Sequence, residues 1–311
     1  MGMGPTWSRR SLQRGFGFRE DQGLTMLRDL EEVSDELTQW AVSDHVRIPT
    51  GYSLFDDRTN GGMAPGQLCF LLARTGVGKT WWLINVAANT ASVPTVFFSL
   101  EMHGRYIMER IASVHTDVGT REIESTLRKG ERCLPLERTV RDFPLLMIED
   151  EPDIGLEDMA VTLETYQELT GVAPRLILID YLELIRAYSD SQMAKVQELS
   201  RALKVFSREH DVAVVVLHQV KRGDHNSGDR PLDLTDGKFG SEESADYVVG
   251  LYKPSLNPNI SQEMRNSLDS DIRLQFLKTR TGGGIHPEGK QHYWNGSTGK
   301  ISEIRFVERQ T

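Results

Sequence analysis

The sequence predicts an α/β fold with a mainly parallel sheet that is covered by helices on both faces. Two observations indicate it. Short, near-continuous apolar segments alternate with longer amphipathic ones from Val46 onward, and a Gly-rich loop joins one apolar segment to a helix. Helices of this length between strands imply right-handed crossovers, which set consecutive strands parallel. With 311 residues, the chain is long enough for one large domain with a buried core.

The expected elements follow from the apolar periodicity of each segment. We expect parallel strands at 67–73, 94–99, 145–148, 175–180 and 212–217. We expect helices at 80–91, at 105–128 with a break at Val118-Gly119, at 156–169 and at 193–210. Gly-rich turns join the later apolar segments, which predicts an antiparallel extension of the same sheet with strands at 247–252, 272–277, 291–294 and 301–306.

Residues 1–45 form an appendage whose charge differs from that of the domain at 46–311. Residues 1–20 carry four arginines and one glutamate, whereas residues 21–41 carry six acidic residues and one arginine. The acidic segment is predicted to be an amphipathic helix, because apolar residues recur every three or four positions at Leu24, Leu27, Leu30, Val33, Leu37 and Trp40. Its apolar stripe packs either on its own domain or on a neighbouring subunit.

The composition is typical of a soluble protein, with 39% hydrophobic and 26% charged residues. The longest apolar runs are far shorter than the ~18 residues needed to span a bilayer, and no apolar stretch of a signal peptide follows the first arginines. Two cysteines, Cys69 and Cys133, suggest a reducing compartment without a zinc site, so we expect a cytoplasmic protein. The net charge of −9 disfavours non-specific coating of nucleic acid but leaves room for a locally basic groove.

The loop in "LLARTGVGKT", residues 71–80, resembles the phosphate-binding pattern G-x-x-x-x-G-K-[ST], with Ala73 in place of the first glycine. Backbone N–H groups of residues 76–80 can wrap a β-phosphate at the start of the following helix. Lys79 would then reach the β- and γ-phosphates, and Thr80 would bind Mg²⁺. The alternative is a Gly-rich turn without a ligand.

Two carboxylates follow other strands of the predicted sheet. Asp180 ends the strand in "LILIDYLEL", where a carboxylate can hold the magnesium ion. Glu101 lies just past the strand in "VFFSLEM", where it can deprotonate the attacking water. A solvated glutamate is the alternative for Glu101, and an aspartate at a strand end is common by itself.

Two more pairs of residues are expected near the same edge of the sheet. His218 and Gln219 end the strand in "VVVLHQVKRG" and could touch a γ-phosphate. Lys278 and Arg280 in "LKTRTGGG" share one strand face and could reach a neighbouring subunit's nucleotide, where they would neutralise charge in the transition state. Each pair could equally be solvated without a role in catalysis.

Taken together, these motifs resemble, from about Ile48 to Gly284, the RecA-like ATPase domain of the DnaB-type replicative hexameric DNA helicases. In that family the loop begins Ala-Arg, as Ala73-Arg74 does here. "FFSLEM", "LILIDYLELI", "VQELSRALKVFSREHDVAVVVLHQVKRG" and "KTR" before glycine resemble its further motifs in the right order.

The resemblance implies a ring, expected to be a hexamer as in the family, that uses ATP and Mg²⁺. It implies Glu101 as catalytic base, Gln219 as γ-phosphate sensor, and Thr80 and Asp180 as metal contacts. Lys278 and Arg280 resemble the pair donated across the subunit interface, and 21–41 the linker helix that docks on the next subunit. The residues expected to contact ATP are Ala73, Arg74, Thr75, Gly76, Val77, Gly78, Lys79, Thr80 and Trp81.

Two features depart from the family. Only about 45 residues stand where the family has a large helical N-terminal domain, and the DNA loop reads "TDGKFGSEESAD". Residues 221–238 carry four basic and four acidic side chains, which is a weak electrostatic footprint for DNA. Backbone N–H groups and stacking could still hold a strand, so the candidate DNA contacts are Lys221, Arg222, Lys238, Phe239 and Gly240.

The function expected from these features is that of an ATP-dependent, ring-forming helicase or translocase on single-stranded or forked DNA, with 5′→3′ polarity, in DNA replication. One alternative is a RecA-like recombination or repair ATPase, or a nuclease, that binds DNA without unwinding it. Another is a nucleotide-dependent scaffold or loader with slow hydrolysis. The sequence identifies no loader or primase partner.

Overall fold

The computed structural model describes residues 28–42, 47–189, 191–220, 228–237 and 243–304. The chain divides into two compact units, Met1–Val46 and Arg47–Thr311. The first unit contains helix α2 (Leu30–Val42), whose first turn carries Glu31 and Glu32 near the positive end of the helix dipole. A helix was expected over 21–41, and the positions before 28 lie outside the described residues.

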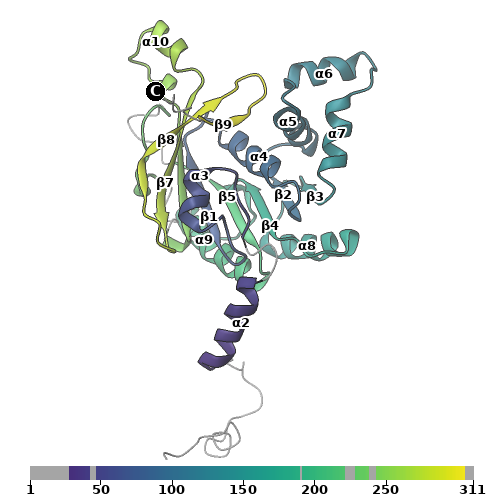
Figure 1. Ribbon diagram of the computed structural model, residues 1–311, viewed down its shortest axis with the longest axis vertical. Helices are drawn as coiled ribbons and strands as arrows, with labels where there is room; N and C mark the ends of the chain where they lie inside the picture. Colours follow the sequence, from purple (N-terminus) through teal and green to yellow (C-terminus); the bar gives the residue numbers. More distant parts are fainter. Residues whose placement is uncertain (1–27, 43–46, 190, 221–227, 238–242, 305–311) are drawn as a thin grey trace, which may run out of the picture. The chain divides into compact units, whose positions relative to one another are not determined.

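The second unit is built on a nine-stranded sheet of order β3-β2-β4-β5-β1-β6-β7-β8-β9 (Figure 1). The first six strands in this order are parallel: β3 (Leu146–Glu149), β2 (Thr95–Ser99), β4 (Leu176–Asp180), β5 (Ala213–Gln219), β1 (Leu68–Ala73) and β6 (Tyr247–Tyr252). The last three are antiparallel: β7 (Asp271–Thr279), β8 (His286–Trp294) and β9 (Ile301–Glu303). The predicted mixed α/β fold is therefore confirmed. The expectation that 247–252 belongs to the antiparallel extension was wrong, because β6 pairs parallel with β1 and only β7 to β9 run antiparallel.

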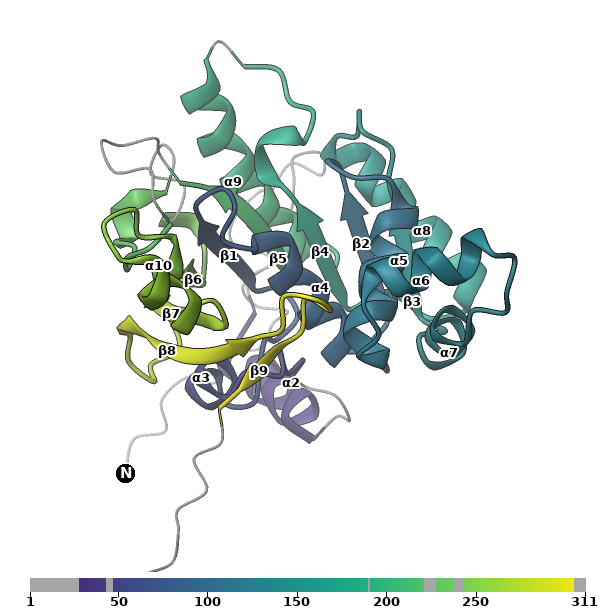
Figure 2. The same ribbon diagram turned by 90° about the horizontal axis from the view of Figure 1, so that it is seen from above.

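Helices cover both faces of the parallel strands, as Figure 2 shows for α4 and α9 on either side of β1 and β5. Alternate strand residues sort into two apolar cores, because side chains point to opposite faces with a period of two. Leu71 and Val215 pack with α4 (Lys79–Asn89) and α5 (Gly104–Thr116). Phe70 and Val216 pack with α8 (Leu156–Thr170) and α9 (Gln192–Glu209).

The predicted helix at 105–128 is two helices, α5 and α6 (Thr120–Arg128). They part at Asp117, whose φ of 60° places it in the left-handed region, one residue before the predicted break. Helix α7 (Leu134–Asp142) was not expected, although a proline in the first turn is compatible with a helix start. The short helices α3 (Ser53–Asp56) and α10 (Gln262–Ser267) were also not expected, and β8 begins earlier than predicted. No helix among the described residues is both long and apolar enough to cross a membrane.

Different polar residues lie where the parallel strands end, here called the carboxyl edge of the sheet, and where they start, the amino edge. At the carboxyl edge, where β1, β2, β4 and β5 end, Ala73 lies opposite Gln219 and Ser99 lies opposite Asp180. Strand β7 runs the other way, so Thr279 at its end lies opposite Tyr247 at the start of β6. The end of β7 therefore lies at the amino edge, beside the start of β1.

Candidate nucleotide-binding site

The phosphate loop leaves β1 at the carboxyl edge and enters α4 directly. Gly76 (φ 84°) and Gly78 (φ 108°) both have left-handed φ values, which glycine adopts without the penalty that a Cβ imposes. Ala73 is buried at the end of β1 and is not among the described residues with positive φ, so its methyl group is accommodated. Val77 is buried, whereas Thr75 and Gly76 are exposed at the tip of the loop and Arg74 is half-buried.

Thr80 and Asp180 meet at this edge from separate elements, α4 and β4. Thr80 Oγ1 donates a hydrogen bond of 2.8 Å to Asp180 Oδ2, and Asp180 is fully buried. Burial raises the pKa of Asp180 to about 6, against the lowering effect of the Thr80 hydrogen bond. The nearby charge of Glu101 raises this pKa further, while Lys79 and Arg110 lower it.

These two residues fit the coordination of a magnesium ion. Among the described residues, Asp180 Oδ1 has no hydrogen-bond partner although it is buried, so an acceptor is left over at the carboxyl edge. In the same part of the chain, no group of three or more His, Cys, Asp or Glu residues is placed to hold a metal. One or two protein oxygens beside a nucleotide suit Mg²⁺, which keeps waters and phosphate oxygens as its other ligands.

Tyr181 connects the phosphate loop to Gln219, a role that was not predicted from the sequence. Lys79 Nζ lies 4.7 Å from the centroid of the Tyr181 ring. Burial raises the pKa of Tyr181, as do the charges of Glu101, Glu183 and Asp180, while a hydrogen bond with the Gln219 side chain lowers it. Lys79, Tyr181 and Gln219 therefore lie together at the position expected for a γ-phosphate.

His218 does not lie with them, which corrects the expectation that it could touch a phosphate. It is fully buried beside Phe70, with the ring centroids 5.7 Å apart, on the face opposite to Gln219 because successive strand residues alternate. Its Nδ1 lies 3.3 Å from Glu183 Oε1, which also accepts the Gln219 backbone N–H at 3.1 Å. Glu183 was not predicted, and it ties the end of β5 to the segment after β4.

Glu101 is exposed two residues beyond β2, whose last residue lies opposite Asp180. Arg110 of α5, which was also not expected at the site, lies close enough for its charge to interact with those of Glu101 and Asp180. Burial lowers the pKa of Arg110, and the charges of Asp180, Glu109 and Glu101 oppose this effect. Its guanidinium lies 4.9 Å from the centroid of the Trp81 ring, which also contacts the ring of Trp294 in β8.

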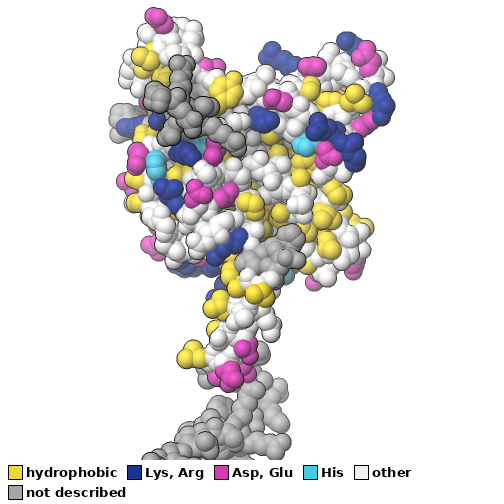
Figure 3. Space-filling view, in the orientation of Figure 1, with side chains coloured by type: hydrophobic (Ala, Val, Ile, Leu, Met, Phe, Trp, Pro, Cys, Tyr) yellow, Lys and Arg dark blue, Asp and Glu magenta, His cyan; other side chains and the backbone are white. Residues whose placement is uncertain are grey.

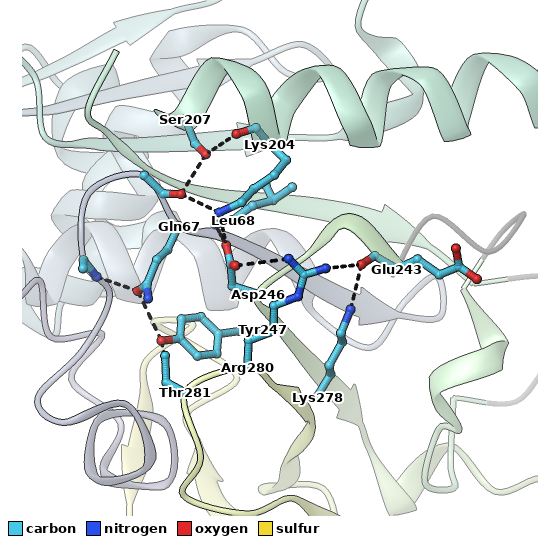
Figure 4. Close-up of polar contacts among 12 residues, drawn as sticks. Gln67, Leu68, Lys204, Ser207, Glu243, Asp246, Tyr247, Lys278, Arg280 and Thr281 are labelled. Atoms are coloured by element: carbon cyan, nitrogen blue, oxygen red, sulfur yellow. Dashed lines mark hydrogen bonds and ion pairs between the residues drawn. The ribbon is translucent and has the colours of Figure 1, made fainter. Parts of the chain in front are cut away.

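Lys278 and Arg280 lie at the amino edge, which corrects the expectation that they share an edge with the phosphate loop. The reason is the antiparallel pairing of β7 with β6. Figure 4 shows both side chains reaching the same acceptor: Lys278 Nζ donates to the Glu243 carbonyl at 2.9 Å and Arg280 Nη2 donates to it at 2.7 Å. The expectation that they share a strand face is consistent with this convergence.

The five candidate DNA contacts, Lys221, Arg222, Lys238, Phe239 and Gly240, lie outside the described residues. The described part of the same connection includes Gly228, which packs directly on the phosphate loop. A Cβ at Gly228 would lie 2.2 Å from Val77 Cγ2, so only glycine fits without a shift. The segment between β5 and β6 therefore contacts the nucleotide loop of its own subunit.

Comparisons with known proteins agree with this architecture. The sequence profile of the DnaB-like helicase C-terminal domain matches residues 47–286. The replicative DNA helicase DnaB of Leifsonia xyli subsp. xyli is 32% identical over 245 residues, which cover 76% of this chain and 52% of that protein. The chain thus spans about half the length of the curated relatives it matches.

Two solved structures share the fold. One is a solved ATPase domain, which superposes with a TM-score of 0.73 at 19% identity and covers 89% of this chain and 99% of that one. A DnaB-like replicative helicase, solved in a study of its interactions with primase, gives a TM-score of 0.74 at 20% identity, covering 89% and 69%. On the profile match, which extends over most of its length, this chain belongs to the DnaB-like helicase C-terminal domain family.

Proposed function

We propose that this protein is an ATP-driven, ring-forming translocase that unwinds DNA with 5′→3′ polarity during replication. The observation that carries the proposal is the convergence of Lys79, Thr80, Asp180 and Gln219 at one sheet edge, with Glu101 just beyond β2. The relatives named replicative DNA helicase support the choice of DNA as the substrate.

Each residue at the edge has a step that its chemistry suits. The loop amides and Lys79 bind the β- and γ-phosphates, and Gln219 contacts the γ-phosphate. Glu101 accepts the proton of the attacking water, a task that suits an exposed carboxylate just beyond the end of β2. Thr80 and Asp180 would hold a magnesium ion, which would neutralise charge on the phosphate oxygens.

The finger residues, Lys278 and Arg280, act on a neighbouring subunit in this proposal. Arg280 lies at the amino edge, a strand's length from the phosphate loop of its own chain, and its side chain is 49% exposed. A guanidinium that cannot reach its own nucleotide but faces solvent is suited to a nucleotide bound by the next copy. Lys278, anchored on the same carbonyl, adds a second positive charge.

Helix α2 offers one contact for such a ring. Its stripe is exposed at Leu30 (86%) and Leu37 (61%), and it is flanked by acidic side chains. A groove of about 740 Å³ between α6 and α7 is lined by Leu134 and by Arg132, Arg138 and Arg141, together with Glu122 and Glu137. It therefore offers an apolar surface with a small excess of positive charge. Figure 3 shows basic, acidic and hydrophobic side chains mixed over these helices, and α2 of a neighbouring copy is the occupant that we assign to the groove.

A disrupted α2 contact tests this assignment. Leu37→Asp introduces a charge into the exposed stripe and should lower the assembled fraction in sedimentation velocity, while Gln39→Ala, at an exposed uncharged position of the same helix, serves as a control. Charge reversal at Arg138 should have the same effect as Leu37→Asp. Full assembly of both variants would contradict the docking of α2 in the groove.

The function itself is tested on labelled forks that carry a 5′ tail, a 3′ tail or both, with ATP and Mg²⁺. Release of intact strands that requires both Lys79 and a 5′ tail is the expected result, with Lys79→Ala as the control. Shortened strands would indicate a nuclease. Intact forks despite DNA-stimulated hydrolysis would indicate a translocase or a repair ATPase that does not unwind.

A further inference from the structure

Asp246, the residue before β6, joins three elements at the amino edge (Figure 4). Its Oδ2 accepts the Leu68 backbone N–H at 2.8 Å and a hydrogen bond from Lys204 Nζ at 2.7 Å. Its own N–H donates to the Leu68 carbonyl at 2.9 Å. Both main-chain groups of Leu68 are thus bound by one residue, which fixes Asp246 to the start of β1 and to α9.

Arg280 is attached to this anchored residue in two ways. The Arg280 backbone N–H donates to the Asp246 carbonyl at 3.1 Å, and Arg280 Nη1 lies 3.7 Å from Asp246 Oδ1. The Asp246 side chain is only 9% exposed, whereas the Arg280 side chain is 49% exposed. The carboxylate therefore supports the guanidinium from the buried side and leaves the other side open.

A finger that acts on another chain needs this arrangement, because its guanidinium cannot be oriented by burial. Its orientation has to come from contacts behind it, and the Asp246 carboxylate and the Glu243 carbonyl supply them. The 3.7 Å separation is longer than a hydrogen bond, and Oδ2 is already paired with Lys204. Asp246 can thus align Arg280 without trapping it.

We propose that Asp246 is the positioning residue of the Arg280 finger, and that it sets the rate of hydrolysis in the neighbouring subunit rather than in its own. This inference rests on the proposed role of Arg280. A misplacement of ~1 Å in a catalytic group can cost up to ~100-fold in rate, so we expect Asp246→Asn to lower kcat at least about tenfold. The affinity of the chain's own phosphate loop for ATP should be unchanged.

The test places the change in a subunit that cannot hydrolyse ATP itself. Wild-type protein is mixed with an excess of tagged Lys79→Ala donor, which keeps its finger, and phosphate release is measured per wild-type subunit. Three further donors carry Lys79→Ala together with Arg280→Ala, Asp246→Asn or Asp271→Asn. Asp271 is the matched control, because its buried carboxylate pairs with Arg273 at 2.9 Å at the other end of β7. Recovery of wild-type protein on the tag measures incorporation.

The Arg280→Ala and Asp246→Asn donors should both lower phosphate release, and the Asp271→Asn donor should match the simple Lys79→Ala donor. A purely structural role for Asp246 would leave the neighbour's site unaffected. If the Asp246→Asn donor does not assemble with wild-type protein, the same measurement is made with an Asp246→Glu donor. This variant keeps the negative charge opposite Lys204 but displaces the carboxylate from Arg280.

Undiminished release with incorporated Asp246 donors, while the Arg280→Ala donor lowers it, would overturn the inference alone. Undiminished release with the Arg280→Ala donor as well would instead refute the action of the finger in the neighbouring site. The two failures are therefore distinguishable.

Discussion

Asp180→Asn should stabilise the nucleotide-free protein at neutral pH although it removes a proposed metal contact. Burial raises the pKa of Asp180 from 3.8 to about 6. Each pKa unit corresponds to about 1.4 kcal/mol, so the ionised carboxylate lowers the free energy of unfolding by about 3 kcal/mol. Because the native state binds this proton more tightly than the unfolded state, the free energy of unfolding falls as pH rises from 3.8 to about 6. Above pH 6 this contribution is constant.

The magnitude can be worked out for two convenient conditions. At pH 5 the ionised carboxylate lowers the free energy of unfolding by about 1.6 kcal/mol, and at pH 7.5 by about 3 kcal/mol. An asparagine keeps an acceptor for the Thr80 hydroxyl but buries an amide without a partner, at a cost of about 1–3 kcal/mol that does not depend on pH. Relative to wild type, Asp180→Asn should therefore gain about 1.4 kcal/mol between pH 5 and pH 7.5.

The assay is urea unfolding in EDTA at both pH values, with Asp269→Asn as the control because that side chain is 74% exposed. The other titrating groups cancel in the difference between variant and wild type. If the difference in free energy of unfolding between Asp180→Asn and wild type is the same at both pH values, the raised pKa of Asp180 is refuted. Added Mg²⁺ and ATP should reverse the order of stability, since only the wild type gains a metal contact there.

Two further substitutions test the packing around the site. Asn85→Leu should lower the free energy of unfolding by about 2–4 kcal/mol in urea, since the buried amide accepts the Ile301 N–H at 2.9 Å and donates to two carbonyls; stability equal to wild type would contradict this. Gly228→Ala should weaken ATP binding about tenfold in a fluorescence titration, because its methyl group would overlap Val77. The double variant Gly228→Ala/Val77→Ala should regain the ATP affinity of the wild type. An affinity that stays low would show that the contact with Val77 does not act on the phosphate loop.

Five of the six parallel strands could be predicted because each is a largely apolar segment next to a helical one, whereas β6 was expected to be antiparallel because Gly-rich turns join the later apolar segments. The phosphate loop was recognised for a related reason, since its whole pattern lies within ten consecutive positions, 71–80. Ala73 lies at the end of β1 with an ordinary φ, so an alanine in place of the first glycine leaves the strand-to-helix turn intact.

The remaining site residues depend on contacts between distant segments. Asp246 and Arg280 are far apart in sequence and meet only because β7 pairs antiparallel with β6, and local patterns do not give that pairing. Arg110 lies on an ordinary amphipathic helix with nothing local to mark it. Tyr181 and Glu183 lie within three residues of Asp180, so the sequence could have marked them as candidate site residues. Their contacts with Lys79 and Gln219 could not be predicted, because these depend on how β5 is aligned with its neighbouring strands.

The placement of the phosphate loop and the finger at opposite edges of one sheet limits how copies can be joined productively. A two-fold pair apposes like edges and completes neither site, whereas head-to-tail stacking completes one site at each junction. An open row of copies then always leaves one nucleotide without a finger, and only closure removes that deficit. Under the proposed role of Arg280, turnover per subunit should therefore climb with protein concentration and level off once the rows have closed.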